Sequence, residues 1–200
     1  LHNFDTPMRG VLSQFICEDF IMANVDAAFG FRNIGKVGSG VQNGGTTLYT
    51  IADNANEAIY KGDHVLSSGG YVVAGTASGA TVLGVFNGCF YIDPTSKKPN
   101  IDAYIYDDPY TLFEVQCDGT IAKTDIGKNT DAAIGSPSTV NGLSKTEIKD
   151  STEATTAGLL TKIIGISKDP DNSDADSANA NWYIMFNEHL KFSSTGITGT

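Results

Sequence analysis

Turn dipeptides between short apolar runs constrain the fold of this chain more than any other feature. Asn87-Gly88 separates residues 81–86 from residues 89–92, and both runs are rich in apolar side chains. Asn-Gly readily adopts the positive φ angles of the two-residue type I′ turn, which joins antiparallel strands. We therefore predict a β-hairpin at this point.

A second dipeptide of this kind, Asp118-Gly119, follows residues 112–117, in which apolar and polar residues alternate. Alternation with period two is typical of a strand that has one buried face. We predict a hairpin here too, with residues 120–123 as its second strand. The side chains expected to face the core are Phe113, Val115 and Cys117.

Other short runs with strand character extend the pattern along the chain. They are residues 48–52, 58–61, 64–66, 71–74, 159–166 and 182–186. We expect the first two to pair as a hairpin, and likewise the third and fourth. In the last run, Trp182, Ile184 and Phe186 should share one face. About eight short strands at this spacing predict an all-β fold, either a small antiparallel β-barrel or a β-sandwich.

Two segments depart from this strand pattern. Residues 1–21 carry apolar side chains at three- and four-residue spacing, which predicts a short amphipathic helix. This leader is either a docking arm or upstream sequence, because Met22 opens an ordinary protein start. Ser144-Lys-Thr-Glu147 matches a capping box and predicts a helical turn or two. We expect residues 22–200 to form a single β-rich domain with an extended N-terminal arm.

The charge balance limits the partners of this chain. Its formal net charge is −10, and Lys97-Lys98 is the one adjacent basic pair. A surface of this kind repels a phosphate backbone, so we expect no nucleic-acid partner. No apolar run reaches the roughly 18 residues that a membrane-spanning helix needs, so we expect no membrane partner.

The cysteines and acidic residues match no familiar metal or redox pattern. Cys17, Cys89 and Cys117 are odd in number and far apart, which favours free buried thiols. The acidic residues 169–176 fail the EF-hand template, because Asp174 stands at its glycine position and Ala180 at its final glutamate position. A calcium loop of another kind stays open as an alternative, and we predict no metal or other cofactor.

The histidines and paired carboxylates do not predict a catalytic centre. His2, His64 and His189 are expected at the surface or at strand edges, without a nucleophile motif beside them. Asp107 and Asp108 are adjacent on a predicted strand, so their side chains should point to opposite faces. We therefore predict that the chain is not an enzyme.

Several stretches resemble virion structural proteins of marine tailed phages, of the capsid decoration or cement type. The matching stretches are Met22-Ala-Asn-Val-Asp-Ala-Ala-Phe-Gly-Phe31, Ile59-Tyr-Lys-Gly-Asp63-x-Val65, Leu83-Gly-Val-Phe-x-Gly-Cys89, Ala103-Tyr-Ile-Tyr-Asp-Asp-Pro109, Phe113-Glu-Val-Gln116 and Pro170-Asp-Asn172. The resemblance implies a head-stabilising protein on the capsid surface, made in the cytoplasm of a bacterial host. It implies two partners, the major capsid protein and further copies of this chain, with a trimer as one option.

The expected partner interface is the segment after Met22. We predict that Phe29 and Phe31 anchor it on the shell, that Arg32 pairs with a shell carboxylate, and that Asn24 belongs to the same surface. The alternative is that both phenylalanines belong to the core of the domain itself.

Two other functions remain open at this stage. A tail or fibre-base protein would have a similar acidic, Thr-rich and β-rich sequence. A carbohydrate-binding β-domain would use exposed aromatic side chains as a platform, and the candidates are Tyr104, Tyr106, Tyr110 and Trp182.

Overall fold

The computed structural model describes residues 24–38, 45–52, 55, 57–89, 101–172 and 174–192. Within these residues the chain forms twelve β-strands and two short 3-10 turns, η1 (Lys123–Asp125) and η2 (Asp150–Thr152). The predicted all-β fold is confirmed. The helix predicted for residues 1–21 and most of the strand predicted for residues 89–92 lie outside the described residues. No helix in the described part is long and apolar enough to span a bilayer.

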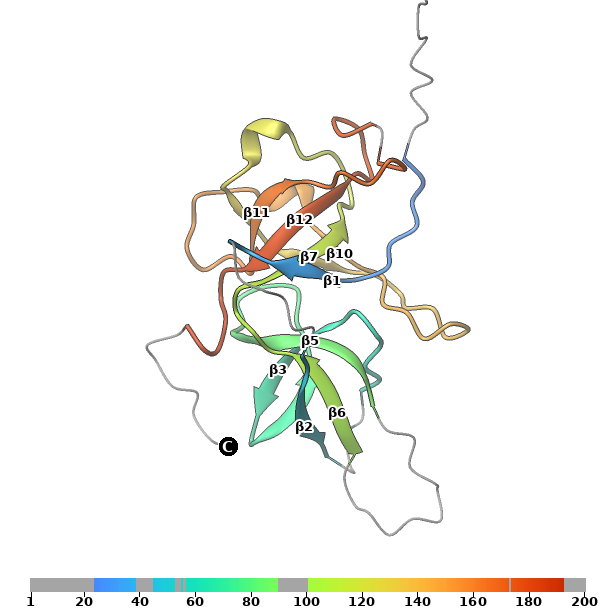
Figure 1. Cartoon of the computed structure of the whole chain (residues 1–200), viewed down its shortest axis with the longest axis vertical. Helices are drawn as coiled ribbons and strands as arrows, with labels where there is room; N and C mark the ends of the chain where they lie inside the picture. Colours follow the sequence, from blue (N-terminus) through green and yellow to red (C-terminus); the bar gives the residue numbers. More distant parts are fainter. Residues whose placement is uncertain are drawn as a thin grey trace, which may run out of the picture.

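Five strands form an antiparallel sheet, called sheet A here, which occupies the upper half of the molecule in Figure 1. In spatial order they are β1 (Arg32–Lys36), β7 (Thr111–Gln116), β12 (Asn181–Phe186), β11 (Thr161–Ile166) and β8 (Asn129–Thr130). A separate hairpin of β9 (Ala132–Ile134) and β10 (Thr146–Ile148) pairs beside it.

Alternating side chains in sheet A behave as the sequence predicts. In β12, Trp182, Ile184 and Phe186 are buried, whereas Tyr183 and Met185 between them are half-buried. Phe113, Val115 and Cys117 are also buried in or just after β7. These two predicted core faces are confirmed.

A second five-stranded antiparallel sheet, sheet B, lies below sheet A in Figure 1. Its spatial order is β2 (Thr47–Ile51), β6 (Ile101–Tyr106), β5 (Val82–Cys89), β3 (His64–Ser68) and β4 (Tyr71–Ala74). The β3–β4 hairpin is confirmed, with Ser68 opposite Tyr71. Strands β2 and β4 approach each other without forming a ladder, so the sheet does not close. Of the two predicted architectures, the sandwich fits.

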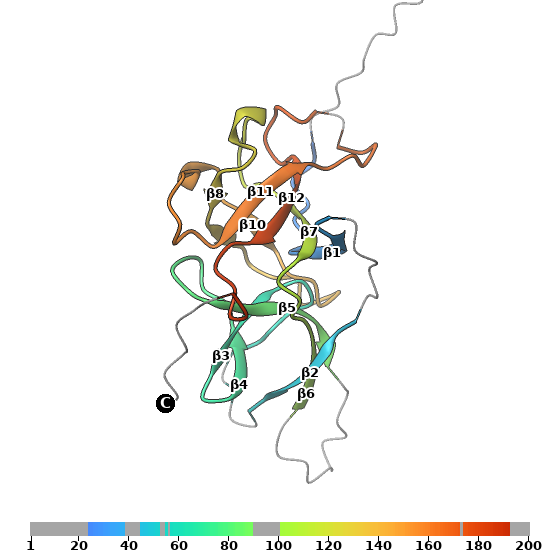
Figure 2. The same ribbon diagram turned by 60° about the vertical axis from the view of Figure 1, so that its left-hand side comes forward.

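Strand β5 connects the two hydrophobic cores. Val82 and Val85 pack into the core beneath sheet A, whereas Leu83 and Phe86 pack into the core of sheet B. Figure 2 shows β5 crossing between the two halves of the molecule. Because both faces of β5 are covered, the two sheets share one folded unit.

The hairpin predicted at Asn87-Gly88 is wrong. Strand β5 runs through both residues and pairs with β6, and a bulge between Phe86 and Gly88 accommodates the extra residue. Gly88 has a φ of 149°, which the bulge accommodates. The long-range ladder and the burial of β5 on both faces outweigh the local preference of Asn-Gly for a turn.

The hairpin predicted at Asp118-Gly119 is also wrong, because β7 pairs with β1 and β12 instead. Asp118 accepts a hydrogen bond from the backbone N–H of Asp150 at 2.8 Å, and the Asp150 carboxylate accepts one from Thr120 at 3.3 Å. These contacts hold the chain after β7 against the η2 turn rather than against β7.

Two further local predictions fail. Residues 58–61 form no strand, and β2 pairs with β6 instead. The helical turn predicted at residues 144–147 is a strand, β10, in which Thr146 and Ile148 are buried against β9 and the main core. Burial of alternate side chains outweighs the capping-box pattern here.

Candidate functional site

The segment of residues 24–31, where we predicted the partner interface, lies along sheet A and leads into β1 (Figure 1). Gln116 holds it: the side-chain oxygen accepts from the N–H of Ala27, and the side-chain nitrogen donates to the carbonyl of Val25, both at 2.9 Å. The Asn24 amide donates to the carbonyl of Asp174 at 2.7 Å and to Ser177 Oγ at 3.1 Å. Asn24 therefore fastens this segment to the chain's own β11–β12 loop.

The two phenylalanines of the predicted interface differ in their environments. Phe31 is 3% exposed, and its ring centroid lies 5.1 Å from that of Phe186. Phe31 is thus a core residue, as the alternative interpretation had it, although one side of it still lines the pocket described below. Phe29 is half-buried and lies under the Arg32 guanidinium, whose central carbon is 4.8 Å from the ring centroid.

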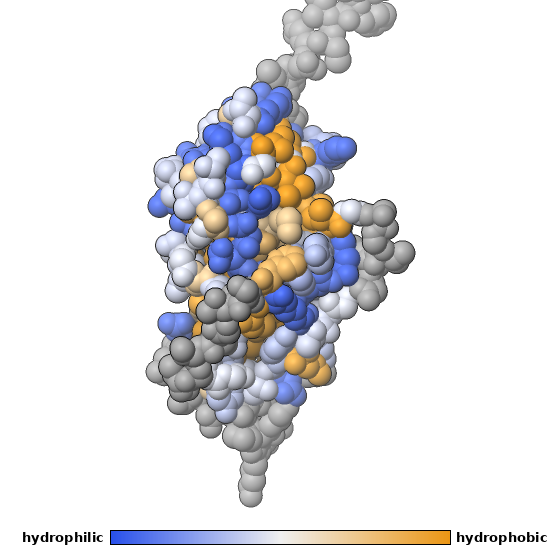
Figure 3. All heavy atoms as spheres, turned by 90° about the vertical axis from the view of Figure 1, so that its left-hand side faces the viewer, coloured by the Kyte–Doolittle hydropathy of each residue, from blue (hydrophilic) through white to orange (hydrophobic). Residues whose placement is uncertain are grey.

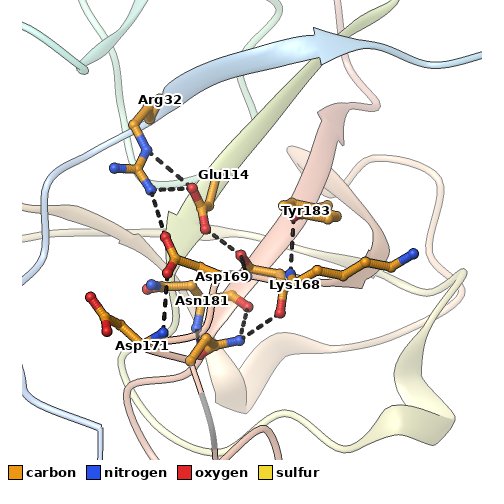
Figure 4. A network of polar contacts seen from close by, with 9 residues as sticks. Arg32, Glu114, Lys168, Asp169, Asp171, Asn181 and Tyr183 are labelled. Carbon is orange, nitrogen blue, oxygen red and sulfur yellow. Dashed lines mark hydrogen bonds and ion pairs between the residues drawn. The ribbon is translucent and has the colours of Figure 1, made fainter.

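Arg32 forms an ion pair with Glu114 of the neighbouring strand β7. Its Nε donates to Glu114 Oε2 at 3.0 Å, and its Nη2 donates to the same oxygen. The Glu114 side chain is 4% exposed and the Arg32 side chain is 53% exposed. Figure 4 shows one edge of the guanidinium facing this carboxylate, with Asp169 also beside it. The carboxylate partner of Arg32 seen here is therefore internal.

The β11–β12 loop is anchored behind this ion pair. Ser167 Oγ donates to the second oxygen of Glu114. Asn172 Nδ2 donates to the carbonyls of Ser167 and Asn181, and its Oδ1 accepts from the N–H of Asn181 at 2.8 Å. The β11–β12 loop is thus fixed at its base (Figure 4), and Glu114 connects it to the segment after Asn24.

A pocket of about 350 Å³ opens where β1 meets sheet B. We call it the seam pocket, and its main lining residues are Phe29, Phe31, Arg32, Lys61, Tyr106 and Leu143. Three of the four residues predicted for the interface therefore line one pocket. Its charged lining side chains are cations, although the chain carries a net charge of −10.

The loop of residues 136–143, called the projecting loop, extends from the β9–β10 hairpin beside the seam pocket (Figure 1). Ser138 and Leu143 bridge its base, and Gly142 accepts a hydrogen bond from the backbone N–H of Lys61 at 3.1 Å. Val140 near its tip is 96% exposed. Val140 is thus an exposed aliphatic side chain on a loop whose base is fixed, which leaves it accessible to a partner.

A further apolar surface lies on the outer face of sheet A. By strand alternation, Leu112 and Met185 point away from the core that receives Phe113 and Ile184, and both are half-buried. Ile34 of the outer strand β1 is 37% exposed. Figure 3 shows that apolar residues gather in patches on one face of the molecule, bordered by hydrophilic residues. The predicted contact with further copies of this chain stays a prediction.

The expectation of surface histidines is wrong for the two that the structure describes. His64 is 1% exposed and its Nε2 lies 2.8 Å from the carbonyl of Thr76. His189 is 2% exposed, and its Nδ1 accepts from the N–H of Lys191 at 3.1 Å. Burial lowers the pKa of both, that of His189 to about 4, with Lys191 contributing. The His64 ring packs against Phe31 and Phe186, which are far from it in sequence, and the His189 ring packs against Phe192.

Asp107 and Asp108 follow the end of β6 and point to different partners, although neither lies in a strand. Asp107 accepts from Lys191 at 2.6 Å, from Tyr49 at 2.7 Å and from Thr47 at 2.9 Å. Burial raises its pKa, but these hydrogen bonds outweigh burial and leave the pKa below its usual value. Asp108 pairs with Lys36, which lowers the pKa of that carboxyl. Both carboxylates fasten neighbouring segments together.

The cysteine prediction is right for one residue and wrong for another. Cys117 is buried, and burial raises the pKa of its thiol to about 12, which leaves it unreactive. Cys89 is free but exposed at the end of β5, where sheet B leaves that strand uncovered. Cys17 lies outside the described residues.

The acidic residues 169–176 do not converge on one point. Asp169 lies 4.0 Å from Arg32, and Asp176 pairs with Lys123 at 3.1 Å. Among the residues described, no three His, Cys, Asp or Glu side chains are placed to hold a metal ion together.

The aromatic residues considered for sugar binding lie in different environments, with Tyr104 and Tyr106 half-buried on one face of β6. Trp182 is fully buried, Tyr110 packs edge-on against Phe192, and Tyr106 lines the seam pocket. Comparisons of the chain with models of protein families, with curated proteins and with solved structures find no match.

The sequence provided no prediction of Lys61 and Leu143 as site residues, and it indicated Tyr106 only for a sugar-binding surface. Lys61 stands in the Ile59-Tyr-Lys-Gly-Asp63 stretch that carries the resemblance, which was the available signal. No sequence signal brings Leu143 to it, because their pairing joins segments some eighty positions apart.

Proposed function

We propose that this chain is a structural protein of a virus particle and that it binds the outside of a phage head as a decoration protein. The resemblance of its sequence to such proteins supports this assignment. The observation that carries it furthest is the projecting loop beside the seam pocket, because together they offer an apolar contact and a recess to one partner. We call the loop and the pocket together the docking face.

The docking face is suited to a lasting contact. The Val140 side chain is exposed to solvent. Backbone hydrogen bonds at Ser138 and Lys61 fix the base of the loop that carries it. A pre-fixed loop loses little conformational entropy on binding, so more of the contact energy contributes to affinity. A protein that stabilises a shell gains from this property.

The charge distribution fits an outer position. With a net charge of −10, the chain would be repelled by packaged DNA on the inner side of a shell. On the outer side the same charge keeps particles from associating with one another.

The test is co-sedimentation of the purified chain with phage heads that lack it. The variant Val140→Asp should reduce binding at least tenfold, because it places a charge in the apolar contact. Ile126→Asp is the matched control, since Ile126 is also an exposed aliphatic residue, 47% exposed, but lies next to η1. Equal binding by both variants would contradict the docking face. A particle reconstruction that places the chain at the tail, or inside the shell, would refute head decoration.

A further inference from the structure

We propose that the seam pocket binds a segment of the shell protein in which an apolar side chain stands next to a carboxylate. This inference rests on the proposed function and specifies the chemistry of its partner. It follows from three properties of the pocket: a pre-positioned guanidinium, an exposed ammonium group and apolar walls.

The guanidinium of Arg32 is positioned before any partner arrives. Its Nε and Nη2 are bonded to Glu114, and its flat face lies over Phe29 at 4.8 Å. Among the described residues, no hydrogen bond to Nη1 is present, and Figure 4 shows this nitrogen pointing away from Glu114. The side chain is 53% exposed, so its free edge can donate to an oxygen of a partner.

Lys61 provides the positive charge of the pocket that is unpaired among the described residues, because the charge of Arg32 is paired with that of Glu114. Glu114 neutralises Arg32, whereas Lys61 is exposed and has no ion pair with any of the residues described. Its backbone forms a β-bridge with Leu143. Its N–H donates to the carbonyl of Gly142, and its carbonyl accepts from the N–H of Ser144. The ammonium group is thus carried on a fixed backbone at the rim of the pocket.

The remaining walls offer both apolar and polar contacts. Phe29, Phe31, Tyr106 and Leu143 line the pocket together with Asn33 and Asn87, and no carboxylate of the described residues does. A volume of about 350 Å³ is at the small end of the range for ligand sites, which suits one side chain and its neighbour rather than an extended ligand.

Charge complementarity explains why the partner segment should be acidic. The chain as a whole repels anions, so an acidic segment is attracted where a cation without an ion pair among the described residues lines the surface, and in the seam pocket that cation is Lys61. This contrast selects one orientation on the shell, because like charges elsewhere oppose other orientations.

The first experiment uses small probes of this chemistry with the full chain. Phenylacetate, benzyl alcohol and phenethylammonium share an aromatic ring and differ in charge. In an NMR titration, phenylacetate should shift the signals of residues that line the pocket, such as Leu143 and Tyr106, and bind at least fivefold more tightly than the other two. Lys61→Gln should weaken phenylacetate binding roughly fivefold. Lys123→Gln, at another exposed lysine, should not.

The outcomes separate this inference from the proposed function. If heads bind the parent chain and Lys61→Gln equally, and phenylacetate does not bind, the acidic partner is refuted while head decoration stands. If phenylacetate binds as expected but heads do not bind the chain, the shell is refuted as the source of the segment. Equal binding of all three probes would overturn the role of charge.

Discussion

The backbone N–H of Ala27 donates to the side-chain oxygen of Gln116 at 2.9 Å, across 89 positions of sequence. The nitrogen of the same amide donates to the carbonyls of Val25 and Asn179, each at 2.9 Å. Gln116 is 4% exposed, so one buried side chain holds the segment after Asn24 against sheet A by hydrogen bonds.

Replacing Gln116 should release that segment. Gln116→Leu keeps the volume of the side chain but removes all three hydrogen bonds, at a cost of about 2 kcal/mol in the free energy of unfolding. Urea denaturation measures this loss, and hydrogen exchange at Ala27 should accelerate. Thr139→Leu, on the exposed projecting loop, should change neither quantity. Unchanged exchange at Ala27 in Gln116→Leu would show that other contacts hold the segment.

Gly30 should not tolerate a side chain. Its φ is +75°, and a Cβ there would lie 2.6 Å from the carbonyl oxygen of Gly62 and 2.6 Å from Ser144 Cβ. We expect Gly30→Ala to lower the free energy of unfolding by roughly 3 kcal/mol, because backbone strain adds to the clash.

Gly127 is the matched control for Gly30. It also has a positive φ, +91°, but no atom lies within 4 Å of its would-be Cβ. Gly127→Ala should therefore cost only the backbone strain, about 1 kcal/mol. Equal losses of thermal stability in both variants would mean that the approach of Gly30 to Gly62 is not tight.

Replacing Arg32 alone should lower the free energy of unfolding more than replacing Arg32 and Glu114 together. Arg32→Leu leaves a 4%-exposed carboxylate without its cation, so we expect a loss of about 2 kcal/mol, moderated by the exposure of the guanidinium. The double variant Arg32→Leu/Glu114→Leu should recover at least half of that loss, since no charge is left buried. A double-mutant cycle from urea denaturation measures the coupling, and additive losses would contradict it.

The sequence predicts side-chain patterns here better than strand partners. Trp182, Ile184 and Phe186 share a buried face because alternation is a local property of one strand. Asn87-Gly88 gives a wrong prediction because strand β5 continues through both residues and pairs with β6. Whether this dipeptide forms a turn therefore depends on a strand elsewhere in the sequence. The partner of a strand is decided by packing over the whole chain, which one dipeptide does not encode.

The same limit applies to the candidate site. Phe29, Phe31 and Arg32, which the sequence predicts as part of one partner interface, line one pocket because all three lie on one short segment, and the interface itself stays a prediction. Sequence reasoning assigns Arg32 a partner on another molecule, whereas the fold brings Glu114 beside it from 82 positions away. Charged residues that pair across strands look unpaired in a sequence.

Glu147 should make the protein less stable above neutral pH. It is half-buried, and burial, together with repulsion from Asp26 and Asp118, raises its pKa from 4.5 to about 7. A raised pKa means that the folded state holds this proton more tightly than the unfolded state. The contribution of this group to the free energy of unfolding is therefore fully present below pH 4.5, and it is lost as the pH rises through about 7.

The variant Glu147→Gln separates this effect from all other titrations. At pH 5 it should melt close to the parent chain, and at pH 8 it should melt a few degrees higher, which corresponds to about 1 kcal/mol after allowance for solvent screening. Asp26→Asn should give part of the same gain, because Asp26 contributes repulsion from the segment that Gln116 holds. Melting temperatures measured from pH 4.5 to 8 test this, and a constant difference between Glu147→Gln and the parent would contradict it. Since Asp26 lies on the segment after Asn24, ionisation of Glu147 should also lower the protection of Ala27 from hydrogen exchange, measured against the intrinsic exchange rate at each pH, and the Gln variant should abolish that loss of protection.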